Sequence, residues 1–247
     1  MPVINSLTFD HLYISLPENS FKKYIKFFTD LNGVHSVVNS SDDSWEGLYL
    51  KSRIGDYFEI LNNKRNGGFG IALSPLRPMY VDVSNILTEQ PHLDWKYGKR
   101  LDGENKPWFD WYSLDNYRDA KNLLFNVWIM DYAKSHSDFK TKLKTNFVDS
   151  FNSIELSLGS SHLSKIEDNL KFTGYEITKD SNQLKFSIPK NDGWNFDVII
   201  HIVDGDSEFT PIQLTLNTYK LDHEILKKYD FVEVKDKDKE VVVRFDK

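Results

Sequence analysis

The first sixty residues combine two hydrophobic periods in an order that restricts the fold. Leu7 to Leu16, with the sequence LTFDHLYISL, alternates apolar and polar side chains from Leu12 onward, as a β-strand does. The segment PENS, from Pro17 to Ser20, ends this strand, and Ser20 is placed to cap a helix. An apolar helical face follows in Phe21 to Phe28. Three more strand patterns come next, at Val34 to Val38, Trp45 to Leu50 and Asp56 to Leu61.

The same β-α-β-β-β order occurs again after residue 150. A strand at Phe151 to Leu158 and a helix at Leu163 to Leu170 precede strands at Tyr175 to Thr178, Gln183 to Ile188 and Phe196 to Val203. A third copy begins with a strand at Pro211 to Asn217, a helix at His223 to Tyr229, and strands at Phe231 to Val234 and Val241 to Phe245. This repetition predicts an α+β fold in which residues 7–75 and 150–205 superpose as modules.

The middle of the chain has a different pattern. It holds four of the six tryptophans, is interrupted by prolines, and shows a helical pattern from Leu114 to about Leu143. We therefore expect a partly helical, aromatic-rich insertion. The predicted division is residues 1–75 for the first module, 76–147 for the insertion, and 148–247 for the second module with a C-terminal βαββ extension.

Composition excludes several classes of function. The chain has no cysteine, so disulfides, zinc–thiolate sites and a cysteine nucleophile are absent. Its net charge is −6, with both signs interspersed, which disfavours nucleic-acid binding. Neither a secretory signal nor an apolar run of about 20 residues is visible. We expect a cytoplasmic protein that binds a small molecule, without nucleic-acid or membrane partners, and whose oligomeric state is open.

The segments FDHLYISL, GLYL, YFEI and GIALSP resemble the vicinal-oxygen-chelate superfamily of glyoxalases, bleomycin-resistance proteins and extradiol dioxygenases. More narrowly, they resemble uncharacterised bacterial glyoxalase-like proteins. The resemblance is best over residues 7–75, is topological over residues 150–247, and is absent from the middle. It implies that modules pair into a curved mixed or antiparallel sheet with helices outside. It also implies a divalent metal in the concavity, held by a His on the first strand and a Glu on the last strand of each module.

The resemblance assigns metal-ligand positions to His11 and Glu59 in the first module. The second module departs from the pattern, because Ser153 takes the position of His11 and His201 that of Glu59. Glu155 shares a strand face with Ser153. The implied site is His11, Glu59, Glu155 and His201, a donor set that suits Zn, Fe, Mn or Ni. The alternative is a half-buried structural His11 bonded to a neighbour and a Glu59 at a solvated edge.

Aromatic side chains are candidates for lining a ligand cleft, the alternative being core packing. The segment KPWFDW, from Lys106 to Trp111, lies in a proline-broken stretch and is the candidate lid. The candidate ligand contacts are Tyr13, Tyr49, Tyr57, Trp108 and Trp111, with Trp45 and Trp194 as further candidates.

Two functions follow from the resemblance. The first is a metal-dependent lyase, isomerase or dioxygenase, in which the metal polarises a small oxygen-bearing substrate and Glu59 or Glu155 is the base. The second is a non-catalytic protein of the same fold that sequesters a small molecule, as bleomycin-resistance proteins do, or binds a protein. Metal analysis of the purified protein separates them.

Overall fold

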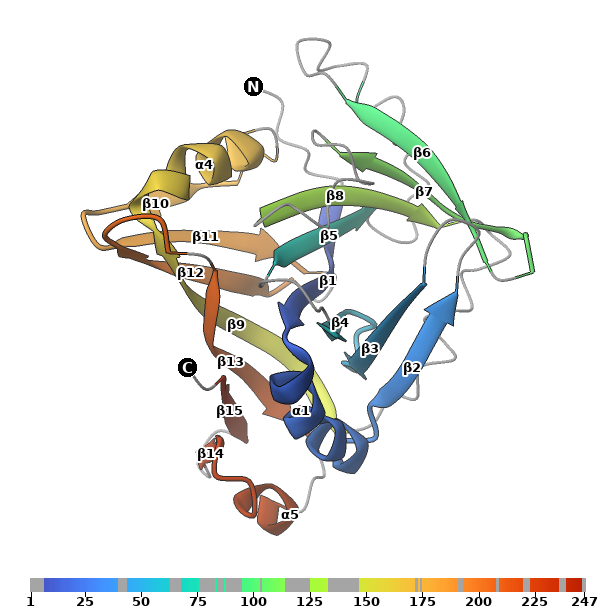
Figure 1. Cartoon of the computed structure of the whole chain (residues 1–247), viewed down its shortest axis with the longest axis vertical. Helices are drawn as coiled ribbons and strands as arrows, with labels where there is room; N and C mark the ends of the chain where they lie inside the picture. Colours follow the sequence, from blue (N-terminus) through green and yellow to red (C-terminus); the bar gives the residue numbers. More distant parts are fainter. Residues whose placement is uncertain are drawn as a thin grey trace.

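The computed structural model of the chain contains two β-sheets and three α-helices in its described part (Figure 1). The described residues are 7–39, 44–62, 68–75, 83, 87, 95–102, 104–113, 125–132, 147–171, 173, 175–190, 193–207, 209–219, 223–235 and 239–245. None of the helices in these ranges is long and apolar enough to cross a lipid bilayer.

Sheet A has eight described strands in the order β2-β3-β4-β1-β5-β8-β7-β6. These strands are β1 (Leu7–Leu16), β2 (Val34–Asn39), β3 (Ser44–Lys51), β4 (Tyr57–Asn62), β5 (Phe69–Pro75), β6 (Lys96–Leu101), β7 (Pro107–Ser113) and β8 (Phe125–Tyr132). The first strand of each half pairs in parallel with the last, β1 with β4 and β5 with β8. The two halves meet at the antiparallel pair β1 and β5, so sheet A contains two copies of one strand arrangement.

Sheet B has seven described strands in the order β10-β11-β12-β9-β13-β15-β14. Its elements are β9 (Val148–Gly159), a 3-10 turn (Ser160–His162), α4 (Leu163–Lys171), β10 (Ile177–Lys179), β11 (Gln183–Pro189), β12 (Asn195–Val203), β13 (Thr210–Thr218), α5 (His223–Lys227), β14 (Val232–Lys235) and β15 (Glu240–Arg244). Strands β9 and β12 pair in parallel and complete a third copy of the module. In the C-terminal copy β13 pairs with β15 antiparallel, as expected for a βαββ unit one strand short.

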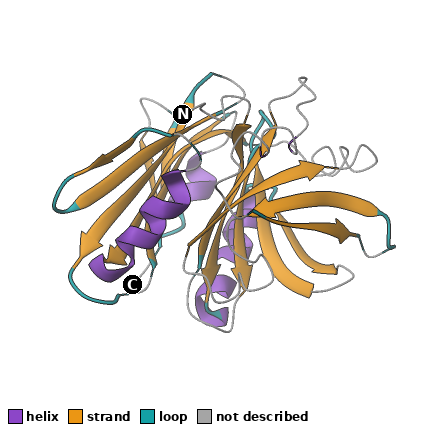
Figure 2. Cartoon of the chain, turned by 90° about the horizontal axis from the view of Figure 1, so that it is seen from above, coloured by secondary structure: helices purple, strands orange, loops and turns teal. Residues whose placement is uncertain are grey.

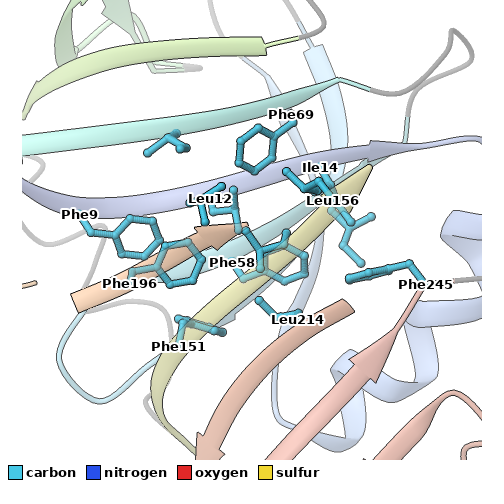
Figure 3. Packing of buried hydrophobic residues seen from close by; sticks show 14 of the residues in the cluster. Phe9, Leu12, Ile14, Phe58, Phe69, Phe151, Leu156, Phe196, Leu214 and Phe245 are labelled. Atoms are coloured by element: carbon cyan, nitrogen blue, oxygen red, sulfur yellow. The ribbon is translucent and has the colours of Figure 1, made fainter. Parts of the chain in front are cut away.

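The two sheets pack against each other through one hydrophobic core (Figure 3). Phe9 of β1 stacks on Phe196 of β12, with ring centroids 4.5 Å apart, and Phe58 of β4 contacts Phe151 of β9. Alternate residues of each central strand point into this core, as strand geometry requires. Burial of this apolar surface therefore fixes the register of both sheets.

Helix α1 (Glu18–Asp30) lies on the core side of sheet A, beside β2, β3 and β4. It begins before the predicted cap Ser20, because Pro17 already provides a helix-compatible φ of −58°. Its apolar stripe is buried and also contacts sheet B, since the Tyr24 ring packs against Phe231. The buried residues of the stripe are Phe21, Tyr24, Phe27 and Phe28. Figure 2 shows the helices lying against the two layers of strands.

The α+β class and the repeated modules are confirmed, but the expected helix from Leu114 to about Leu143 needs correction. Residues 125–132, predicted as helical, form strand β8, and together with β6 and β7 they extend sheet A. The described strands of the expected insertion are β6, β7 and β8, and they form one half of sheet A together with β5, because β8 pairs with β5. Residues 76–82, 114–124 and 133–146, including the rest of the expected helix, lie outside the described residues. The modules at 7–75 and 150–205 lie in two different sheets, which pack against each other.

Candidate functional site

The face of sheet A that points away from sheet B is concave. Trp45 on β3 stacks on Trp108 on β7, with ring centroids 6.0 Å apart and planes 6° apart. Four strands separate β3 from β7 in the sheet order, so contact between these rings requires the sheet to curl toward its outer face. We call this outer face the aromatic face. Its apolar cluster consists of Ala72, Trp108, Phe109, Trp111, Trp128 and Met130, with Tyr13, Trp45 and Tyr132 against it.

One row of residues crosses the aromatic face from β3 to β8. Tyr49 pairs with Glu59, Glu59 with Tyr13, Tyr13 with Gly70, and Gly70 with Asn126. Directly paired residues of neighbouring strands point to the same side of a sheet. The row therefore places an acid, two phenols and an amide along one line on the concave side of the sheet.

Glu59 is the acid of this row, and it is 6% exposed. Burial raises the pKa of the Glu59 carboxyl to about 7, and hydrogen bonds from Tyr49 and Trp45 offset part of that rise. Trp45 Nε1 also donates to the Tyr49 hydroxyl at 2.7 Å. The alternative expectation of a solvated edge position for Glu59 is therefore wrong. Strongly shifted acids of this kind are concentrated at functional sites.

His11 lies on the aromatic face next to a β-bulge. The register of β1 against β5 shifts between Phe9 and His11, so Asp10 is an extra residue. His11 Nδ1 is 2.8 Å from Asp10 Oδ1, and both residues are buried. The Tyr132 hydroxyl donates to the same carboxylate oxygen at 3.3 Å. The His11 ring stacks on Tyr57, with centroids 4.2 Å apart.

Gly70 leaves room for two large side chains at the centre of the row. A Cβ atom at this position would lie 2.2 Å from Tyr13 Cε1 and 2.8 Å from Trp128 Cζ3. The Tyr13 ring therefore lies over the Gly70 backbone, and its centroid is 5.5 Å from that of Trp128. Tyr13 forms the floor of the concavity at the middle of the row.

We expect Gly70→Ala to destabilise the protein by about 1–3 kcal/mol, because Tyr13 must leave its position to admit the new methyl group. Urea unfolding measures this change. In the double variant Tyr13→Leu/Gly70→Ala the smaller side chain relieves the clash. The cost of Gly70→Ala should accordingly shrink in that background, and equal costs in both backgrounds would show that Tyr13 is not the obstacle.

Glu155 and His201 lie on the outer face of sheet B, across the core from the aromatic face. Their strand neighbours Ile154 and Ile200 are fully buried in the shared core, so the polar side chains point the other way. His201 Nε2 is 3.0 Å from Glu155 Oε2, and Gln213 Nε2 donates to Glu155 Oε1 at 2.7 Å. The expectation that His11, Glu59, Glu155 and His201 share one concavity does not hold, because the two pairs belong to sheets packed back to back.

The described residues do not fit the metal site that the resemblance implies. On β5 and β8, the row of His11 continues as Ala72 and Trp128, and the row of Glu59 continues as Gly70 and Asn126. None of these four residues is His, Cys, Asp or Glu. Within the described ranges, no three residues of those types gather closely enough to hold a metal ion.

The structure gathers most of the predicted ligand contacts on the aromatic face. Tyr13, Trp108 and Trp111 belong to its apolar cluster, and Tyr49 and Tyr57 pack together beside it. By contrast, Trp194 is an exposed residue between β11 and β12 of sheet B. Several residues of this face were not predicted as site residues, among them Asp10, Asn126 and Trp128. Asn126 and Trp128 reach this face only because β8 pairs with β5. The sequence of β8 had a helical pattern, so this strand was not predicted.

No family model matches the chain, and no curated protein matches it. Solved structures match the fold at low identity, among them the following three. A hypothetical protein from Staphylococcus aureus has 13% identity and a TM-score of 0.50, over 82% of this chain and 88% of that one. The 2,2',3-trihydroxybiphenyl 1,2-dioxygenase of Sphingomonas wittichii strain RW1 has 9% identity and a TM-score of 0.51, over 93% and 82%.

A fusion of a xylose isomerase-like TIM barrel with 4-hydroxyphenylpyruvate dioxygenase has 10% identity and a TM-score of 0.51. The match covers 90% of this chain but 39% of the fusion protein. These likenesses show that this chain shares its fold with proteins named as dioxygenases, in line with the resemblance that the sequence motifs carry. At this level of identity they concern the fold alone, and the activity has to be argued from the aromatic face.

Proposed function

We propose that the chain binds a small, flat molecule on the aromatic face of sheet A and does so without a metal. The observation that carries this proposal is the buried acid Glu59 inside an aromatic concavity. A buried carboxyl group with a raised pKa destabilises the folded protein at neutral pH. Its presence despite this cost favours a role in binding. Aromatic side chains with a few polar groups among them are typical of small-molecule sites.

The neighbours of Glu59 support a binding role for this part of the face. Trp45 and Tyr49 fix one side of the carboxyl group by hydrogen bonds. Trp45 also stacks on Trp108, so the two sides of the curled sheet meet next to Glu59. A flat ligand could stack on these rings in place of part of their contact with each other. The buried aromatic surface area would then stay about the same.

A divalent-metal-dependent reaction on an oxygen-bearing substrate is the second candidate. The observation that favours it is the presence of His11 and Glu59 on one concave face, at the strand positions that the resemblance gives to metal ligands. Two of the solved structures with this fold are named as a dioxygenase or a dioxygenase fusion, at 9% and 10% identity. The Asp10 contact at His11 Nδ1 is compatible with metal ligation through Nε2, as in many metal-ligating histidines. Against this candidate, no three His, Cys, Asp or Glu residues in the described part of the chain gather closely enough to hold a metal ion.

Equilibrium dialysis with 2-ethylnaphthalene tests the first candidate. We expect binding that is unchanged by a metal chelator, and elemental analysis should find less than one transition-metal ion per chain. Ala72→Phe adds bulk at the floor of the aromatic face and should weaken binding at least about tenfold, or about 1.4 kcal/mol. Ser153→Phe adds the same bulk to sheet B and serves as the matched control.

Binding of the probe that Ala72→Phe leaves intact, in a variant with native circular dichroism, would contradict this location. A stoichiometric transition metal whose removal abolishes binding would favour the second candidate instead.

A further inference from the structure

The geometry points to Asn126 as a recognition residue that donates a hydrogen bond to a carbonyl, carboxylate or phenolate oxygen of the bound molecule. This inference rests on the proposed binding function and adds a chemical requirement to it. The ligand class is a flat molecule about two rings long with an oxygen acceptor at the β8 end of the aromatic face.

The first support is an unmet hydrogen-bonding need. Asn126 is 1% exposed, and its Nδ2 atom has no hydrogen-bond partner in the part of the chain that the structure describes. Leaving a buried donor unpaired costs about 1–3 kcal/mol, so native proteins rarely retain one without a partner. A ligand oxygen would supply the missing partner.

The second support is the fixed orientation of the amide. Ser113 Oγ on β7 donates to Asn126 Oδ1 at 3.2 Å, and the same hydroxyl lies 3.2 Å from the carbonyl oxygen of Val127. Ser113 itself is fully buried. Because the oxygen end of the amide is held by β7, the nitrogen end is the one left for another molecule.

The third support is the direction in which Asn126 points. Its neighbours Phe125 and Val127 are buried in the core shared with sheet B. Strand alternation therefore turns Asn126 to the aromatic face, beside Trp128. Gly70, its direct partner on β5, has no side chain to meet the amide.

The length of the ligand follows from the row that joins Glu59 to Asn126. The row runs from β4 through β1 and β5 to β8, which is three strand spacings of about 4.8 Å, or about 14 Å along the sheet. Curling of the sheet shortens the direct path. Two fused or linked rings, with a hydrogen bond at each end, span such a distance above Tyr13.

A matched pair of probes tests the inference by equilibrium dialysis on the full chain. 2-Acetylnaphthalene carries a carbonyl acceptor, and 2-ethylnaphthalene has nearly the same shape without one. We expect the wild type to bind the ketone about tenfold more tightly, as one hydrogen bond to a buried donor allows. Asn126→Leu, which keeps the size of the side chain, should bind both probes equally. Asn152→Leu, the same change on β9 of sheet B, is the control and should keep the preference.

Asn126→Asp at alkaline pH gives a second measure, because the ionised carboxylate is an acceptor and should reverse the preference, whereas burial keeps the carboxyl protonated, and so a donor, at lower pH. Equal binding of the two probes by the wild type would overturn the role of Asn126 while leaving the proposed function intact. A preference that survives in Asn126→Leu would overturn it too. Failure of both probes to bind the wild type would instead contradict the proposed function, on which this inference depends.

Discussion

Phe58→Ala should lower the free energy of unfolding by about 4 kcal/mol and should destabilise both sheets together. Phe58 is fully buried on β4, and its ring contacts Phe28 of α1, Phe151 of β9 and Phe245 beyond β15. Truncation removes apolar contacts and leaves a cavity between two layers that cannot easily close. Chemical denaturation followed by circular dichroism measures the change.

Tryptophan fluorescence tells whether the sheets unfold as one unit. Trp45, Trp108, Trp111 and Trp128 all lie in sheet A, so fluorescence reports mainly on that sheet. Phe151→Ala, a change in sheet B, should shift the fluorescence transition as Phe58→Ala does. Val37→Ala on the edge strand β2, where Val37 is 61% exposed, should cost less than about 0.5 kcal/mol. Separate transitions for fluorescence and circular dichroism would refute a shared core.

Glu59→Gln should stabilise the protein by about 3 kcal/mol at pH 8 and by little at pH 4. The folded pKa of Glu59 is about 7 and its ordinary value 4.5. The unfolded chain therefore gives up this proton at lower pH than the folded chain. The contribution of Glu59 to stability is complete below pH 4.5 and is lost as pH rises to about 7, by about 1.4 kcal/mol for each pH unit. Glutamine stays neutral and removes this loss.

Unfolding measured from pH 4 to pH 9 in both proteins tests the assignment. Glu46 provides a control of opposite sign, because hydrogen bonds from Asn62 and His35 lower its pKa. Glu46→Gln should remove stability that the wild type has at neutral pH and loses as pH falls. Parallel stability curves for the wild type and Glu59→Gln would mean that the Glu59 carboxyl ionises normally.

The local pattern of the sequence was sufficient for most individual elements. Strand period, helical period and turn residues predicted β1, α1 and the strands of sheet B within a few residues of their observed bounds. These signals are local, since alternation of side chains follows from the backbone geometry of a single strand. The resemblance carried by FDHLYISL and YFEI predicted the fold, and the likeness to solved structures confirms that fold.

Tertiary structure alone decided which strands share a sheet and which polar residues meet. The apolar run of β8 is buried on both faces, by Val127 on the core side and Trp128 on the aromatic side, so it lacks the alternation that marks a half-buried strand. Likewise, alternation places Glu155 on one face of its strand, but it does not say which sheet that strand joins. Strand β1 pairs with β5 and not with β9, and this pairing separates Glu59 from Glu155. The same pairing brings Glu59 into one row with Asn126. Pairing between distant strands depends on packing of the whole core, and no local period of the sequence predicts it.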